Sequence, residues 1–156
     1  MAGTPKVRTC LWFGKDGLEA AEFYVSLLPD SRIESIFRPQ PDAPALTVDF
    51  TLAGTPYQVL NGGPHYTLSP AASISVTTQD QAETDRLWAS LTADGGEESM
   101  CGWLVDRWGV SWQIVPQRLL ELLSHPDSAA AGRAQEAMMH MRKIDIAALD
   151  AAFNGA

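Results

Sequence analysis

The chain repeats one order of predicted elements twice, and this repetition constrains its fold more than any other feature. Asp16 and Glu19 form an acidic capping pattern that opens a predicted helix after a short strand. A shift of 64 residues, from 16 to 80, carries the pattern to Asp80 and Glu83, again between a strand and a helix. Because order, spacing and helix polarity agree, the sequence predicts an internal duplication.

The last strands of the two halves overlay with an offset of 55 residues, because the second half has a shorter middle. This offset takes Gly54 to Gly109 and Gln58 to Gln113. Each half then reads as a β-α-β-β-β module, and the second module ends in a predicted hairpin over residues 100–116. The alternative is two ordinary strand–helix units with chance matches, because acidic capping patterns are common.

Apolar periodicity and turn residues give the approximate bounds of the elements. Strands are expected at 7–13, 31–37, 45–53, 57–60 and 72–77, and helices at 17–28 and from Asp80 to Gly95. The hairpin is expected to turn between Asp106 and Gly109. Three short helices follow, and Asp145 is a predicted cap of the last one. Their apolar residues are expected to pack against the sheet and to contribute to a dimer contact.

We therefore expect an α+β fold in a single domain over residues 1–156. Module one is expected at 5–64, module two at 70–116, and a helical tail at 117–156. This length is sufficient for a substantial hydrophobic core.

Composition excludes several classes of function. A net charge of −8 argues against binding to nucleic acid, whose phosphates require a basic surface. The apolar runs are too short to span a bilayer, and the first residues lack the layout of a signal peptide. Cys10 and Cys101 are far apart in sequence, which favours reduced thiols in the cytoplasm. Cys10 is interpreted as a small core residue.

Several motifs in the chain resemble those of a known family. They are Cys10-Leu11-Trp12-Phe13, Leu60-Asn61-Gly62-Gly63-Pro64, Cys101-Gly102-Trp103-Leu104 and Asp106-Arg107-x-Gly109-Val110-Ser111-Trp112-Gln113-Ile114-Val115-Pro116. Through them the chain resembles the PhnB-like proteins, also called the 3-demethylubiquinone-9 3-methyltransferase family. That family belongs to the glyoxalase, bleomycin-resistance and dioxygenase group, the vicinal-oxygen-chelate superfamily. The resemblance implies two βαβββ modules whose sheets curl around a cavity, usually in a homodimer.

Metal-using relatives in this superfamily bind a divalent ion with His or Glu side chains from the first and last strands of each module. The resemblance and the two offsets carry these positions to Thr9, Gln58, Ser73 and Gln113. Hydroxyl and carboxamide groups are poor ligands for zinc, nickel or iron. We therefore expect no metal and no other cofactor. A slip of one residue would bring Cys10 in place of Thr9, with its side chain on the opposite face of the strand.

Neutral polar groups in an apolar cavity are suited to orienting a small ligand through hydrogen bonds. The candidate ligand-binding residues are Thr9, Gln58, Ser73, Gln113, Tyr57, Trp103 and His65. The alternative is structural: the two glutamines would satisfy each other or water, and the aromatic residues would belong to the core. His65 is included because it follows the strand that carries Gln58.

Two classes of function remain open from the sequence. The first is a PhnB-like protein that binds a small polar and apolar ligand without a transition metal. The second is a glyoxalase-like or dioxygenase-like enzyme acting on a small oxygenated substrate. Methyl transfer is not favoured, because no glycine-rich loop follows a first strand as an adenosyl cofactor on a Rossmann-type sheet would require. No catalytic residue is identified.

Overall fold

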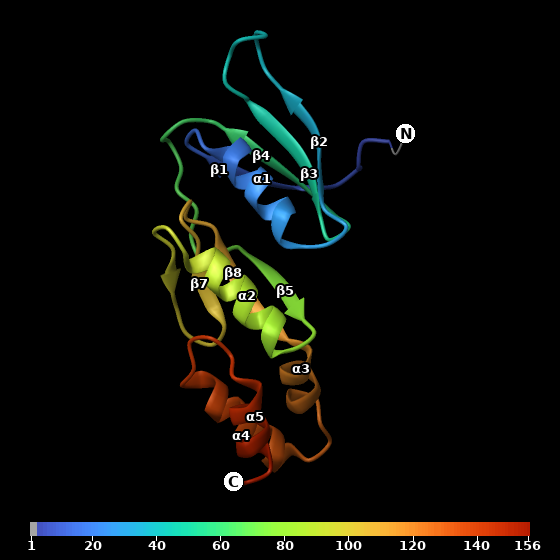
Figure 1. Cartoon of the computed structure of the whole chain (residues 1–156), viewed down its shortest axis with the longest axis vertical. Helices are drawn as coiled ribbons and strands as arrows, with labels where there is room; N and C mark the ends of the chain where they lie inside the picture. Colours follow the sequence, from blue (N-terminus) through green and yellow to red (C-terminus); the bar gives the residue numbers. More distant parts are fainter. Residues whose placement is uncertain (1–2) are drawn as a thin grey trace. The chain divides into compact units, whose positions relative to one another are not determined.

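The computed structural model describes residues 3–156 and contains two compact units, one ending at Leu68 and the other beginning at Ser69. In the first unit the elements follow the order β-α-β-β-β (Figure 1). They are β1 (Thr9–Phe13), α1 (Gly17–Leu27), β2 (Arg32–Phe37), β3 (Thr47–Leu52) and β4 (Thr55–Asn61).

The first unit is a four-stranded mixed sheet with one face covered by α1. The strand order is β1-β4-β3-β2, in which β1 and β4 are parallel and the other pairs are antiparallel. Along β3, buried Val48, Phe50 and Leu52 alternate with partly exposed residues. This period of two separates a core face from an open face of the sheet. The core face packs against Tyr24 of α1, whose ring lies 6.4 Å from the ring of Phe50.

The start of α1 differs from the prediction of a capping box. Asp16 occupies the N-cap position but makes no side-chain capping hydrogen bond. Instead, the amide of Gly17 donates to Oδ1 of Asn61 over 2.8 Å. The Asn61 Nδ2 in turn donates to the carbonyl of Ala45 over 2.9 Å. The Asn-Gly-Gly-Pro motif at the end of β4 thus supplies the cap, so the prediction for Asp16 was wrong.

The second unit repeats the same order of elements and adds a tail of three helices. The elements are β5 (Ser73–Thr78), α2 (Gln81–Thr92), β6 (Glu97–Glu98), β7 (Trp103–Val105), β8 (Ser111–Pro116), α3 (Gln117–Leu123), α4 (Ser128–Met139) and α5 (Ile146–Phe153). The strand order β5-β8-β7-β6 matches that of the first sheet, again with one parallel pair. The predicted β-α-β-β-β modules are therefore confirmed, and the fold class is α+β.

The second capping box is present as predicted. Asp80 Oδ1 accepts a hydrogen bond from the amide of Glu83 over 2.8 Å. The Glu83 carboxylate accepts from the amide of Gln79, one residue before the cap, over 2.7 Å. Asp145 also caps its helix, because its side chain accepts from the amide of Ala148. Local sequence alone determines these two helix starts.

Asp106 organises the predicted hairpin. Its side chain is buried, and its Oδ1 accepts from the amides of Trp108 and Val110 at 2.9 and 3.0 Å. Its Oδ2 accepts from the indole Nε1 of Trp112 over 2.9 Å. Gly109 has a φ of +89°, as the predicted tight turn requires. One carboxylate therefore ties the turn to the core of the second sheet.

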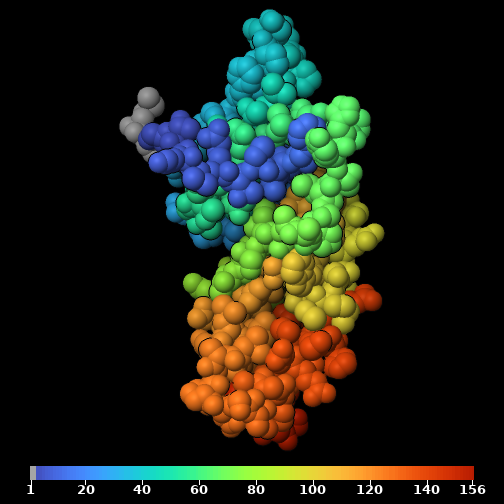
Figure 2. Space-filling model, turned by 180° about the vertical axis from the view of Figure 1, so that it is seen from behind, coloured from blue at the N-terminus to red at the C-terminus, as the bar shows by residue number. Residues whose placement is uncertain are grey.

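The helical tail is bonded to the loop that precedes β7. The amides of Cys101 and Gly102 donate to the carbonyls of Met141 and Arg142 over 2.7 and 2.8 Å. Both Cys101 and Gly102 have positive φ angles, which direct their amides towards the tail. Figure 2 shows the tail in orange and red against the yellow atoms of this region. The tail has its own small core, made of Leu119, Leu122, Ala134, Ile144 and Leu149.

Within the described residues, no helix has the length and apolar character needed to cross a membrane.

Candidate functional site

A row of four side chains crosses the open face of the first sheet. The Cα atoms of Cys10 and Gln58 are register partners on β1 and β4, and Gln58 is the partner of Asp49 on β3. Asp49 is in turn the partner of Ser35 on β2. Side chains at paired positions lie on the same face of a sheet. The four strands therefore place a thiol, a carboxamide, a carboxylate and a hydroxyl side by side.

Asp49 is the centre of this row because both of its oxygen atoms are bonded. Its Oδ1 accepts a hydrogen bond from Nε2 of Gln58 over 2.8 Å and lies 3.3 Å from Nε of Arg8. Its Oδ2 accepts from the hydroxyl of Ser35 over 3.0 Å. The side chains of Asp49 and Arg8 are only 29% and 27% exposed. Partial burial strengthens the pair relative to a fully exposed one.

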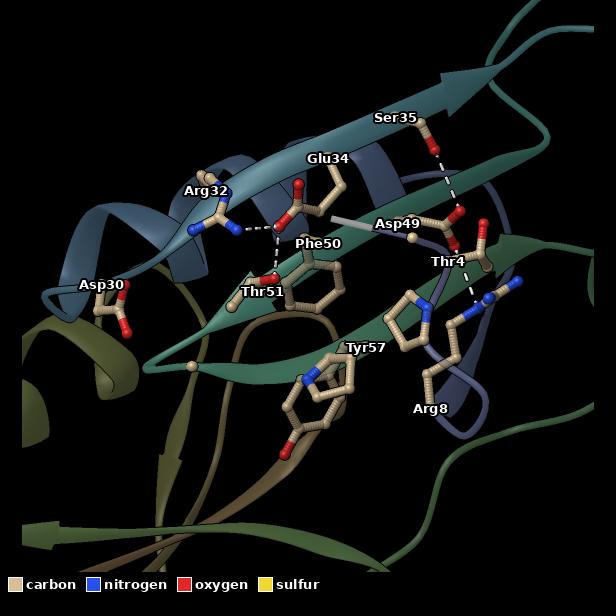
Figure 3. A pocket seen from close by; sticks show the side chains of 14 residues that line it. Thr4, Arg8, Asp30, Arg32, Glu34, Ser35, Asp49, Phe50, Thr51 and Tyr57 are labelled. Carbon is tan, nitrogen blue, oxygen red and sulfur yellow. Dashed lines mark hydrogen bonds and ion pairs between the residues drawn. The ribbon is translucent and has the colours of Figure 1, made fainter. Parts of the chain in front are cut away.

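The open face continues into a hollow of about 780 Å³ in the first unit (Figure 3). This volume is in the range of small-molecule sites. Besides Arg8, Asp49 and Ser35, its lining includes Thr4, Asp30, Arg32, Glu34, Phe50, Thr51 and Tyr57. A second ion pair lies along β2, where Nη2 of Arg32 is 2.9 Å from Oε1 of Glu34. The same Oε1 accepts a hydrogen bond from the Thr51 hydroxyl over 2.6 Å. The hollow therefore combines paired charges with aromatic surface.

Two titratable groups near the row favour their neutral forms. Partial desolvation raises the pKa of the Cys10 thiol, the charge of Arg8 opposes this change, and the charge of Asp49 adds to it. Burial also raises the pKa of the Tyr57 phenol. Cys10 is exposed, contrary to its interpretation as a core residue, because β1 turns it towards the open face. At neutral pH the row offers an uncharged thiol, and the hollow an uncharged phenol from Tyr57; both are hydrogen-bonding groups rather than strong nucleophiles.

The donor set does not fit a transition metal. Asp49 is the carboxylate in the row, and a guanidinium already lies against the oxygen atom that a cation would need. Its neighbours are a carboxamide, a hydroxyl and a thiol whose pKa is raised. Across residues 3–156, no three His, Cys, Asp or Glu side chains gather closely enough to coordinate an ion. Zinc, nickel and iron sites need imidazole, thiolate or free carboxylate ligands.

The second sheet has an equivalent but less charged row. Gln113 is the register partner of Ser75 on β5 and of Trp103 on β7. Its Nε2 donates to the hydroxyl of Ser73 over 2.9 Å. Ser111 lies two residues before Gln113 on the same face, and its hydroxyl is buried with no hydrogen-bond partner within the described part of the chain. Three of the predicted residues, Ser73, Gln113 and Trp103, therefore lie together on one open face.

The offset between the first strands of the two modules is 65 residues rather than 64. Cys10 is beside Gln58, and Ser75 is beside Gln113, so 10 corresponds to 75. The extra residue lies in the connection to the helix, which contains residues 14 and 15 in the first module and residue 79 in the second. The helix positions of the two modules therefore correspond with a shift of 64 residues, and the first-strand positions with a shift of 65.

Thr9 and Tyr57 are placed by the same register on the core face of the first sheet. They are partners of each other, and the Tyr57 ring stacks on Phe50 at 5.4 Å. Tyr57 still reaches the hollow, but Thr9 does not share a face with Gln58. His65 is exposed in the turn after β4 and lies outside the row. Its neighbour Tyr66 packs edge-on against Trp12, with ring centroids 4.9 Å apart.

Sequence reasoning did not identify Arg8, Asp49 and Ser35. One signal was present: β3 reads Thr-Val-Asp-Phe-Thr-Leu, so a carboxylate interrupts the middle of a strand with strict alternation. A charge at such a position needs a partner from a neighbouring strand. Strand order was required to find the partners, because they come from β2, from β4 and from the residue just before β1.

The reactivity of Cys10 is expected to report the charges beside it. Asp49→Asn removes a charge that raises the thiol pKa, so alkylation by iodoacetamide at pH 8 should become severalfold faster. Arg8→Gln removes a charge that lowers this pKa, so the same reaction should become slower. Mass spectrometry of peptides containing residue 10 or residue 101 measures each rate. Cys101 serves as the internal control, and equal changes at both thiols would contradict the expectation.

Comparisons with known proteins agree with this architecture. A family model described as 3-demethylubiquinone-9 3-methyltransferase matches residues 5–115, so α3, α4 and α5 lie beyond it. The chain is 30% identical to a PhnB protein from Bacillus cereus with the same family description. That similarity covers 72% of this chain and 99% of the other, with a TM-score of 0.66. No curated protein sequence matches.

Two more distant solved structures show similarity of fold alone. Protein PA1353 from Pseudomonas aeruginosa is 20% identical, with a TM-score of 0.60 over 72% of this chain and 98% of the other. The genomically encoded fosfomycin resistance protein FosX from Listeria monocytogenes is 16% identical, with a TM-score of 0.55 over 80% of this chain and 100% of the other.

Proposed function

The chain belongs to the 3-demethylubiquinone-9 3-methyltransferase family of PhnB-like proteins, and from this premise we propose that it binds a small molecule without a transition metal. Its fold is that of the vicinal-oxygen-chelate superfamily, as the sequence motifs indicated. The ligand is proposed to lie on the open face of the first sheet. Gln58 and its neighbours would contact polar groups of the ligand, and the aromatic part of the hollow would contact its apolar part.

The observation that carries this proposal is the bonding of Asp49. Its oxygen atoms are occupied by Arg8, Gln58 and Ser35, so the open face presents paired charges and neutral donors. Such a surface can orient a ligand through hydrogen bonds, but it cannot easily exchange a proton with it. For this reason we favour binding over the alternative, an enzyme acting on a small oxygenated substrate.

Methyl transfer is not carried over from the family description. Each sheet has a single parallel strand pair, between its first and last strands. An adenosyl cofactor on a Rossmann-type fold uses several parallel strands and a glycine-rich loop after the first. The homodimer, the cytoplasmic location and the arrangement of both modules in one domain stay predictions from the sequence.

A thermal-shift experiment tests the proposal. We expect a library of small polar and apolar compounds to contain ligands that raise the melting temperature, whereas Ni²⁺, Zn²⁺ and EDTA leave it unchanged. A ligand at about 100 times its Kd stabilises a protein by ~2.7 kcal/mol. Gln58→Leu should remove most of this shift, because the variant keeps the volume but loses the carboxamide.

Gln135→Leu is the matched control, since Gln135 is exposed on α4 in the other unit. This variant should retain the full response. Binding of Ni²⁺ or Zn²⁺ in a ratio of one ion per chain, lost in Gln58→Leu, would contradict the metal-free proposal. Stabilising ligands that are insensitive to Gln58→Leu would contradict the proposed location.

A further inference from the structure

Arg8 is a partly buried cation with only one of its bonding edges in use. Its Nε lies 3.3 Å from Oδ1 of Asp49, and its side chain is 27% exposed. Within residues 3–156 its two terminal nitrogen atoms have no partner. Figure 3 shows these atoms beyond the Asp49 carboxylate, directed away from Tyr57. The guanidinium is therefore held at one edge and open at the other.

A guanidinium whose Nε is bound and whose terminal nitrogens are free is preorganised to bind an anionic group. Its terminal nitrogens form a planar fork that matches two oxygen atoms of a carboxylate, phosphate or phosphonate. The bond to Asp49 fixes the plane of the fork before a ligand arrives. A ligand therefore does not have to order a free arginine side chain, which would otherwise oppose binding.

The charges around the hollow favour an anion at Arg8 rather than elsewhere. Glu34 is paired with Arg32 and also accepts a hydrogen bond from Thr51, and that arginine is more exposed, at 56%. Asp30 carries a negative charge at the other end of the hollow, where Figure 3 shows it apart from Arg8, with Phe50 and Tyr57 between them. An anionic group is repelled from that end, whereas beside Arg8 the nearest negative charge, Asp49, is already paired with the guanidinium.

Neutral groups beside Arg8 complete the site. Oε1 of Gln58 has no partner within the part of the chain that the structure describes, because the Nε2 of this side chain is the atom bonded to Asp49. Cys10 on β1 is the register partner of Gln58, and Arg8 lies two residues earlier, just before the strand begins. A ligand bound to the fork thus also meets a carbonyl acceptor and a weak S–H donor.

We infer that the ligand of the first sheet carries a terminal oxyanion, a carboxylate or a phosphonate or phosphate group, which binds the terminal nitrogens of Arg8. This inference rests on the proposed function and specifies the chemical class of the ligand. The remainder of the ligand avoids the charge of Asp30.

Alkylation of Cys10 provides a local measurement of binding. The probes are pentanoate, butylphosphonate and the neutral control pentanamide, at constant ionic strength, in a Cys101→Ser background. The reagent is iodoacetamide, which is uncharged and does not itself seek Arg8. A bound anion offsets the charge of Arg8 and covers the thiol, so both anions should slow alkylation severalfold and in a saturable way. Pentanamide should have no such effect.

Two variants distinguish this site from a general effect of salt. Arg8→Gln should abolish the protection by both anions, with folding verified by circular dichroism. Arg32→Gln, which removes the other arginine of the hollow, should leave the protection intact. The relative concentrations at half protection then indicate whether the carboxylate or the phosphonate is preferred.

The inference is overturned if neither anion protects Cys10, if pentanamide protects it equally, or if protection persists in Arg8→Gln. Failure of the proposed function has a different signature. In that case no compound, whether anionic, cationic or neutral, stabilises the wild-type chain in the thermal-shift screen. If neutral ligands stabilise the chain through Gln58 while anions do not protect Cys10, only the oxyanion inference is lost.

Discussion

Asp106→Ala is expected to lower the free energy of unfolding by ~3–5 kcal/mol. The carboxylate is 3% exposed and accepts hydrogen bonds from the amides of Trp108 and Val110 and from the indole of Trp112. The substitution takes the acceptor from three donors at once and leaves a cavity beside a fully buried indole. Urea denaturation of the full chain, followed by circular dichroism, measures the loss.

Asp106→Asn separates the contributions of the two oxygen atoms. Asparagine keeps Oδ1 for the amides of Trp108 and Val110 but places an NH₂ group against the Trp112 Nε1, where two donors then face each other. We expect an intermediate loss of ~1–3 kcal/mol. Asp94→Asn, which removes the charge of an exposed partner of Arg107 and tolerates the positive φ of this residue, should cost less than ~1 kcal/mol. Equal losses for Asp106→Ala and Asp94→Asn would show that the Asp106 carboxylate does not organise the hairpin.

Gly102→Ala is the second substitution with a large expected effect, ~3–5 kcal/mol in the free energy of unfolding. Gly102 has a φ of +81°, which an L side chain adopts only with strain. An added Cβ would also lie 2.9 Å from the carbonyl oxygen of Ile114 and 3.2 Å from Cγ1 of Ile144. The first neighbour is backbone within β8 and cannot move without disturbing the sheet. Differential scanning calorimetry and urea denaturation measure the change.

Gly109→Ala is the matched control for Gly102→Ala. Gly109 has a similar φ of +89°, but an added Cβ would meet no atom within 4 Å. Gly109→Ala therefore introduces the same backbone strain without a steric clash, and we expect it to lower the free energy of unfolding by ~1–2 kcal/mol. If both substitutions cost the same, the close packing of Gly102 against β8 and Ile144 contributes nothing to stability.

Local signals in the sequence predicted the elements of both modules. The alternation of apolar and polar residues, together with turn residues, predicted the strands. The capping box at Asp80 predicted a helix start that the structure confirms. The start of α1 could not be found in this way. Its cap comes from Asn61, 44 residues further along the chain, and only strand pairing places that side chain beside Gly17.

The candidate site was predicted only in part, because it depends on register. Gln58, Ser73 and Gln113 were placed on the open faces by the repeated pattern, but Thr9 was displaced by one residue from the position beside Gln58. A connection that is one residue longer in the first module causes this displacement, and a shift of one residue moves a side chain to the other face. Arg8 and Asp49 were missed for a related reason: their pairing joins the residue just before β1 to β3, across β4.

The bonds between the tail and the loop before β7 have a consequence for the order in which the chain folds during synthesis. Every strand of the first sheet is present once residue 61 has been made, so that unit can close early. The amides of Cys101 and Gly102 must wait for Met141 and Arg142, which are translated some forty residues later. On the ribosome, the second unit therefore reaches its final form only after residues 141 and 142 have been made.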